Sequence, residues 1–246
     1  MKSQLFVAVL VVGLVMSAVP SSACSNTTIQ GSWGFLLAGA NSNKLTAVVG
    51  QITADGKGGL TGSETISSNG VISPNVALTG TYSITTACTG MATITPSGFP
   101  AAKYNLTVVS TGKQIEMVDT ATGSTEFGYA LARGTSTCTD AAVKGTFGFE
   151  GGGFNSSLVP KAFAGQVKLD GAGNLTGTET ASVGGTIASG PISGTYSVNS
   201  DCTGSVSVTF KTKKFINNFV IVNGDKSALE ISTDSGDITT TTVAKQ

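Results

Sequence analysis

The chain has 246 residues, no histidine, and equal numbers of basic and acidic side chains, 14 of each. Charged residues make up only 11% of the chain, compared with about 25% in average soluble domains. The charge balance leaves no overall basic field to attract nucleic acid or an anionic membrane. The lack of histidine excludes catalytic triads and histidine-ligated metals, and we expect no catalytic residues, no metal and no cofactor.

Residues 1–23 have the pattern of a secretory signal peptide. Lys2 precedes an apolar run over residues 5–15, and Pro20 is followed by the small residues 21–23, which suit a cleavage site. The run is shorter than the roughly 20 residues needed to cross a bilayer, so we predict a secreted or periplasmic protein with no transmembrane segment. The alternative is a lipoprotein anchored through Cys24.

An internal repeat organises the rest of the chain. The segment at 31–35, Gly-Ser-Trp-Gly-Phe, returns as Gly-Thr-Phe-Gly-Phe at 145–149, and the Asp-Gly-rich segment at 55–65 returns at 170–180. These blocks are offset by 114 or 115 residues, a period too long for a solenoid and suited to tandem domains. The sequence therefore predicts one domain over 24–134 and a second over 138–246.

The cysteines follow the same repeat. Cys24 and Cys88 are 64 residues apart, and so are Cys138 and Cys202. In an exported chain, this register predicts one disulfide within each copy. A zinc site is disfavoured because the chain has no Cys-x-x-Cys pair and no histidine.

Short segments of alternating apolar and polar residues indicate about eight strands in each copy. Asp-Gly pairs at 55–56 and 170–171 have the composition of tight hairpin turns. Eight short-looped strands favour an up-and-down antiparallel barrel, so the fold class is all-β with two tandem barrels. In the first copy the expected strands are 32–39, 45–54, 59–67, 76–85, 90–95, 103–110, 114–120 and 125–133.

A Gly-x-Trp start and a cation at the end of the last strand resemble the calycin and lipocalin pattern. In the first copy these residues are Trp33 and Arg133, and in the second copy Phe147 and Lys245 take their places. The resemblance implies that the aromatic ring plugs one barrel end and that the cation packs across it. Dirigent-like and allene-oxide-cyclase-like barrels have the same eight-stranded architecture and remain compatible.

Two immunoglobulin-like β-sandwiches are the alternative fold, because a tryptophan lies between cysteines at a similar spacing. Cys24 precedes the first expected strand, however, whereas that fold places its first cysteine within a strand. A barrel is therefore favoured.

Four side chains are candidates for binding a ligand inside the barrels. Strand periodicity places Glu64 and Tyr82 of the first copy, and Glu179 and Tyr196 of the second, on the inward face. Within each copy the glutamate and the tyrosine could meet, either as a polar anchor in a ligand cavity or as a purely structural pair.

Three classes of function remain open. The first is a non-enzymatic protein that binds a small apolar or amphipathic ligand in its barrels. The second is a structural or adhesive protein of the cell envelope or extracellular space. The third is a barrel enzyme of the isomerase type.

Overall fold

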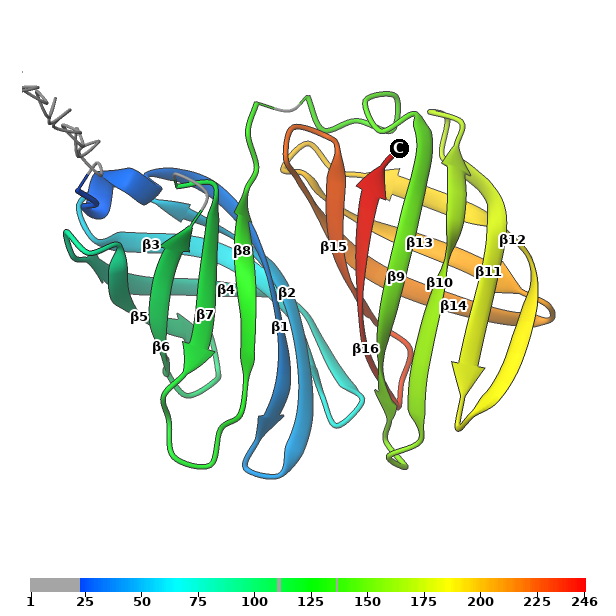
Figure 1. The fold of residues 1–246 in the computed structure, drawn as a ribbon, viewed down its shortest axis with the longest axis horizontal. Coiled ribbons are helices and arrows are strands. Elements are labelled where there is room, and N and C mark those ends of the chain that lie inside the picture. The colour runs from blue at the N-terminus through cyan, green and yellow to red at the C-terminus, as the bar shows by residue number, and fades with distance from the viewer. Residues whose placement is uncertain (1–22, 110–111, 136) are drawn as a thin grey trace, which may run out of the picture.

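The computed structural model describes residues 23–109, 112–135 and 137–246, and it contains two closed eight-stranded barrels lying side by side (Figure 1). The expected signal peptide lies almost wholly outside the described residues. The first barrel consists of β1 (Gly31–Asn41), β2 (Lys44–Ala54), β3 (Gly59–Ser68), β4 (Val71–Ile84), β5 (Thr89–Pro96), β6 (Ala102–Val109), β7 (Gln114–Asp119) and β8 (Phe127–Ala132). The second consists of β9 (Gly145–Asn155), β10 (Pro160–Leu169), β11 (Asn174–Val183), β12 (Thr186–Val198), β13 (Thr203–Phe210), β14 (Lys213–Val222), β15 (Ser227–Ser232) and β16 (Asp237–Lys245).

Each strand pairs antiparallel with the next, and the last strand of each copy returns to the first. Trp33 of β1 pairs with Ala132 of β8, and Phe147 of β9 pairs with Lys245 of β16. This closure confirms the tandem up-and-down barrels and excludes the sandwich alternative, whose sheets would keep open edges.

One end of each barrel carries the disulfide, and we call it the disulfide end. Cys24 is bonded to Cys88 and Cys138 to Cys202, with Cα–Cα distances of 4.9 Å in both pairs. The predicted pairing is confirmed. The alternative of a lipid anchor on Cys24 is wrong for this structure, because the sulfur that would carry the lipid is bonded to Cys88.

The opposite end of both barrels is called here the mouth end. It is formed by the strand connections at 42–43, 69–70, 97–101 and 120–126 in the first barrel, and at 156–159, 184–185, 211–212 and 233–236 in the second. Both mouths face the same way, toward the lower part of Figure 1. The amide of Gly236 in one mouth donates to the carbonyl oxygen of Gly70 in the other, at 2.9 Å.

The expected Asp-Gly hairpin turns form at the disulfide end. Oδ1 of Asp55 accepts hydrogen bonds from the amides of Lys57, Gly58 and Gly59 at 2.7–2.9 Å, while Gly56 has a φ of 79°. A positive φ favours glycine, which explains the Asp-Gly pair. These amide hydrogen bonds hold the pKa of Asp55 below its usual range.

Three apolar clusters fill the molecule. One lies inside each barrel, and the third lies between the barrels, where the outer faces of β1 and β2 meet those of β14, β15 and β16. Burial of this shared apolar surface holds the barrels together. The third cluster consists of Leu36, Ala47, Val49, Val220, Val222, Leu229, Ile231 and Ile238.

Across the described residues, the short 3-10 turn Asn26–Ile29 is the one helical element, and no helix has the length and apolar character needed to span a membrane.

Candidate functional site

The second barrel encloses a cavity of about 380 Å³. Its wall is predominantly apolar, and a few carboxyl, amide and amine groups interrupt it. Cavities of roughly 300–1,000 Å³ with this composition are typical of small-molecule sites. Apolar lining residues include Val143, Phe147, Phe149, Phe163, Phe219 and Ile221.

Several inward side chains of the second barrel are smaller than their counterparts in the first, and this leaves room for the cavity. Glu64 pairs with Val76 in the first copy, whereas Glu179 pairs with Gly190 at the corresponding place in the second. Two similar exchanges occur on β11 and β15, while Phe163 in place of Val48 acts in the opposite sense by covering Gly151. The two further exchanges are Ile66 to Ala181 and Ile115 to Ala228.

The two interiors consequently differ in packing. The first barrel has a continuous buried core that includes Phe35, Val48 and Ile66. In the second barrel Phe149 takes the place of Phe35 and Phe163 that of Val48. Both rings are only half-buried, because they border the cavity.

Two of the carboxyl groups that line the cavity, Glu179 and Glu230, face it from different sides. Glu179 comes from β11 and Glu230 from β15, four strands apart in the eight-stranded barrel. Nδ2 of Asn217 donates to Oε2 of Glu230 at 3.0 Å. Burial raises the pKa of Glu230 from its usual 4.5 to about 7 and also raises that of Glu179. Both groups are therefore poised to gain from a ligand that donates hydrogen bonds or carries positive charge.

The cavity extends to the mouth end of the barrel. There Lys161 forms an ion pair and hydrogen bond with Asp237, and both side chains border the cavity together with Val183 and Lys213. At the disulfide end, Val143 and Phe147 are buried and close the floor. Access from solvent is therefore expected through the mouth end.

The expected glutamate–tyrosine pairs do not form. The hydroxyl of Tyr82 accepts from the amide of Gly56 at 2.9 Å and donates to the carbonyl oxygen of Asn26 at 3.1 Å. Tyr196 makes the same two bonds, with the amide of Gly171 and the carbonyl oxygen of Asp140. Each tyrosine therefore fastens the Asp-Gly turn to the segment before the first strand, although the ring of Tyr196 also lines the cavity.

Glu64 does face the interior of the first barrel, where it lies among other carboxyl groups. Burial, and secondarily the negative charge of Glu126, raises the pKa of Glu64 to about 7. Burial also raises the pKa of Glu126 and of the neighbouring Tyr104. Within the described residues, no histidine, cysteine or carboxyl side chains are grouped so as to hold a metal ion.

The aromatic residues expected to act as plugs, Trp33 and Phe147, are buried in both copies, but the surroundings of the associated cations differ. Trp33 is buried, and its Nε1 donates to the carbonyl oxygen of Ile29 at 2.8 Å. Lys245 Nζ lies 5.6 Å from the centre of the Phe147 ring. The guanidinium of Arg133 instead points toward the second barrel.

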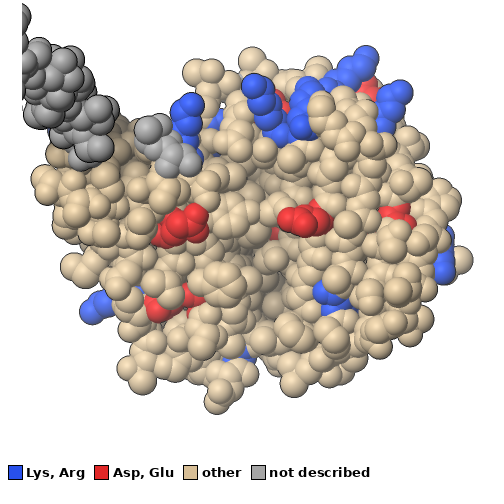
Figure 2. Space-filling view, viewed as in Figure 1, with Lys and Arg blue, Asp and Glu red and all other residues tan. Residues whose placement is uncertain are grey.

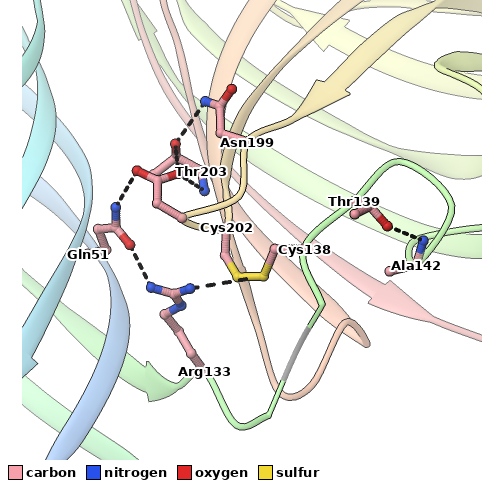
Figure 3. Close-up of a disulfide and its surroundings, with 9 residues drawn as sticks. Gln51, Arg133, Cys138, Thr139, Ala142, Asn199, Cys202 and Thr203 are labelled. Carbon is pink, nitrogen blue, oxygen red and sulfur yellow. Dashed lines mark hydrogen bonds between the residues drawn. A yellow bond between two sulfur atoms is a disulfide. The ribbon is translucent and has the colours of Figure 1, made fainter.

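Arg133 takes part in a hydrogen-bonded chain that crosses between the barrels. Its Nη1 donates to Oε1 of Gln51 at 2.7 Å, and Nε2 of Gln51 donates to Oδ2 of Asp201 at 2.9 Å. Asp201 in turn accepts from the amide and the hydroxyl of Thr203 at 3.0 and 2.6 Å. Figure 3 shows Arg133 and Gln51 facing the turn that carries Cys202 and Thr203.

A second, more polar cleft lies between the barrels, with a volume of about 240 Å³. Hydroxyl and amide side chains from both copies line it, and Asn218 Nδ2 donates to Thr65 Oγ1 across it at 3.1 Å. Polar lining residues are Ser63, Glu64, Thr65, Asn75, Ser197, Asn199, Thr203, Ser205 and Asn218.

Glu230 and Asn217 were not recognised as site residues from the sequence. The counterparts of these two residues in the first copy are Met117 and Tyr104, so comparison of the copies offered a signal. A carboxyl group that replaces an inward methionine indicates a polar function or a cavity.

No protein-family model matches the chain, and no curated protein matches it. The calycin resemblance therefore stays a prediction. Among solved structures, the chain is similar to a Myxococcus xanthus hemagglutinin that was crystallised with a3,a6-mannopentaose. Identity is 13% and the TM-score is 0.18, over 87% of this chain and 99% of that one. A likeness of this extent carries no argument about function.

Proposed function

We propose that this protein is an exported, non-enzymatic binding protein that holds one small amphipathic molecule in its second barrel. The cavity of about 380 Å³ carries this proposal. Export is supported by the two disulfides, which persist in oxidising compartments. The first barrel, with its packed core, acts as a rigid partner.

The chemistry of the cavity wall defines the class of ligand. An apolar body would fill the space between the phenylalanine rings, and a donor or cationic group would face Glu179 and Glu230. Among the described residues, no free cation inside the cavity faces these two carboxyl groups, because Lys161 is paired with Asp237 and Lys213 is exposed at the mouth. An alkyl amine therefore suits the cavity better than a fatty acid does.

Binding is favoured over catalysis by the partners of the carboxyl groups. Glu230 accepts a hydrogen bond from the side-chain amide of Asn217. This amide group positions the carboxyl group but cannot relay a proton. General acid–base chemistry needs titratable groups positioned together on the reacting atoms, whereas Glu179 on β11 lies four strands away from Glu230 on β15.

Calorimetric titration with octylamine at pH 8 tests this function. The wild-type protein should bind one amine per chain, and Glu179→Gln combined with Glu230→Gln should weaken binding by about tenfold or more, since a charge-assisted hydrogen bond is worth roughly 1.5–3 kcal/mol. Glu150→Gln on the outer face is the matched control, because Glu150 is exposed. Failure of the wild-type protein to bind, or equal affinity in the double variant, would exclude the proposal.

A second candidate is adhesion through carbohydrate recognition in the cleft between the barrels. The specific observation in its favour is the array of hydroxyl and amide groups contributed by both copies. Asn75→Ala should then reduce binding to an immobilised glycan without changing octylamine affinity. Binding to no glycan in an array would remove this candidate and leave the first intact.

A further inference from the structure

Large apolar side chains are exposed mainly at the mouth end of the molecule. Among the described residues, Met91, near the disulfide end of β5, is the exception. Leu158 is 64% exposed and Ile187 is 72% exposed, and both lie at the rim of the second barrel. The mouth-end set is Val71, Phe99, Val118, Phe127, Phe154, Leu158, Val183, Ile187 and Ile216.

Exposed cations lie at the same end of the molecule. Lys211, Lys213 and Lys214 lie at the β13–β14 connection, and Lys44 and Lys103 lie at the mouth of the first barrel. Lys213 Nζ is 5.1 Å from the centre of the ring of Phe215, a half-buried residue that lines the cavity near the mouth.

The acidic side chains at the mouth end are buried, or they already have an ion-pair or hydrogen-bond partner. Asp119 and Glu126 are buried, and Asp237 is paired with Lys161. Asp234 is half-buried, and its Oδ2 accepts from the amide of Ile216 at 3.2 Å. The mouth end therefore has a local excess of positive charge that the neutral net charge of the chain conceals.

The disulfide end has a different distribution. It also carries exposed lysines, such as Lys57, Lys168 and Lys226, and has exposed acidic residues at its turns, such as Asp55, Asp170 and Asp201. Of the described residues at that end, Met91 alone exposes a large apolar side chain. Figure 2 shows Lys and Arg side chains gathered along the upper, disulfide end of the second barrel as well, so the charges alone do not distinguish the two ends. The pairing of apolar tips with lysines is therefore a property of one end of the molecule.

We propose that the mouth end of both barrels docks on an anionic lipid surface. Exposed apolar side chains beside lysines suit the boundary between headgroups and acyl chains, where the apolar tips insert and the cations meet lipid phosphates. Isolated exposed apolar residues are ordinary, but a group of them gathered at one end marks an interaction surface. The hydrogen bond from Gly236 to Gly70 holds the two mouths side by side, so both contact one surface.

This inference does not depend on a ligand in the second barrel, although the cavity opens at the same end. A docked protein would present that opening to the lipid, which is the phase from which an amphipathic molecule would enter.

Co-sedimentation with vesicles tests the docking. The full chain should bind vesicles of phosphatidylcholine mixed with phosphatidylglycerol, and bind pure phosphatidylcholine vesicles much more weakly. Replacing Lys211, Lys213 and Lys214 by serine should weaken binding by about fivefold for each lysine, since each contributes roughly 1 kcal/mol near an anionic surface. Leu158→Ser and Ile187→Ser should each weaken it by about tenfold.

Matched variants at the disulfide end provide the control. Met91 is 63% exposed, so Met91→Ser removes a similar apolar area, and serine in place of Lys57, Lys168 and Lys226 removes the same charge. These variants should bind vesicles like the wild-type protein, and all variants should keep the wild-type melting temperature because the altered side chains are exposed. Absence of wild-type binding, or equal losses at both ends, would overturn the proposal. Self-association that mouth-end variants abolish, without vesicle binding, would assign the surface to a second copy instead.

Discussion

Gly34 of the first barrel lies directly against Val222 of the second. A Cβ atom on residue 34 would stand 2.6 Å from Cγ1 of Val222 and 2.8 Å from Cγ1 of Val220. The glycine is therefore required by the close approach of the barrels, and the repeated Gly-x-Trp-Gly-Phe motif serves the interface in its first copy.

We predict that Gly34→Ala destabilises the protein by about 1–3 kcal/mol, because an added methyl group overpacks the contact between the barrels. Thermal unfolding measures this effect. Gly148→Ala is the control at the repeated position, where the nearest atom would be Gln246 Nε2 at 3.6 Å. Equal melting temperatures for the two variants would show that the barrels do not pack as described.

The chain from Arg133 through Gln51 to Asp201 should couple the barrels energetically. Arg133→Met and Gln51→Ala are each expected to destabilise the protein by about 1–2 kcal/mol. Because the two side chains are hydrogen-bonded to each other, the double variant should lose less than the sum, with a coupling of about 0.5–1 kcal/mol. Denaturant titration of the wild type, the two single variants and the double variant measures this coupling. Strictly additive losses of stability would contradict the hydrogen bond between Arg133 and Gln51.

The buried Glu64 predicts a loss of stability as the pH rises. Its pKa is raised from 4.5 to about 7 in the folded protein, so the folded state binds more protons than the unfolded state between these values. Stability contributed by the protonated form is therefore present below pH 4.5 and is lost as the pH rises toward 7. Glu64→Gln should be more stable than the wild type by about 3 kcal/mol above pH 7, at about 1.4 kcal/mol per pKa unit.

Free energies of unfolding measured from pH 4 to 8 test this dependence. The exposed Glu116→Gln serves as control and should keep the wild-type slope. A Glu64→Gln variant with that same slope would place the titrating group elsewhere.

Each disulfide should stabilise its own barrel to a similar extent. Both close loops with a sequence separation of 64 residues, for which the chain-entropy model gives about 4 kcal/mol. Removing Cys138 and Cys202 together by alanine substitution should lower the melting temperature about as much as removing Cys24 and Cys88. Calorimetry measures both changes, and a large difference between them would show that the copies are not equivalent at this end.

Much of the fold could be predicted from the sequence because the repeat and the two-residue periodicity are local patterns. The disulfides, the Asp-Gly turns and the inward direction of Glu64 and Glu179 followed from them. The hydrogen-bond partners of the tyrosines could not be predicted in this way. Periodicity gives the face of the strand on which a side chain lies, but not its position along the barrel axis relative to residues on the next strand. Tyr82 lies at the disulfide end, whereas the cross-strand neighbour of Glu64 is Val76.

The interface between the barrels was also missed, although a signal was present. Residues Phe35 to Leu37 and Val48 to Val49 are apolar on consecutive positions, so both faces of these strands are apolar. A strand with two apolar faces is expected to be covered on both. Predicting the cavity of the second barrel would have required a comparison of the inward residues of the two copies. That comparison depends on the register of the strands, which the sequence does not give.

Titration with the fluorescent amine 1-aminoanthracene tests the central claim most directly, namely that the second barrel is a binding cavity and the first is filled. The comparison is between the wild type and a variant carrying Ala181→Ile, Gly190→Val and Ala228→Ile, which restores the side chains of the first copy. We predict one saturable site per chain in the wild type and none in the variant, with the fold retained. Binding that survives in the filled variant, or two sites in the wild type, would contradict the account.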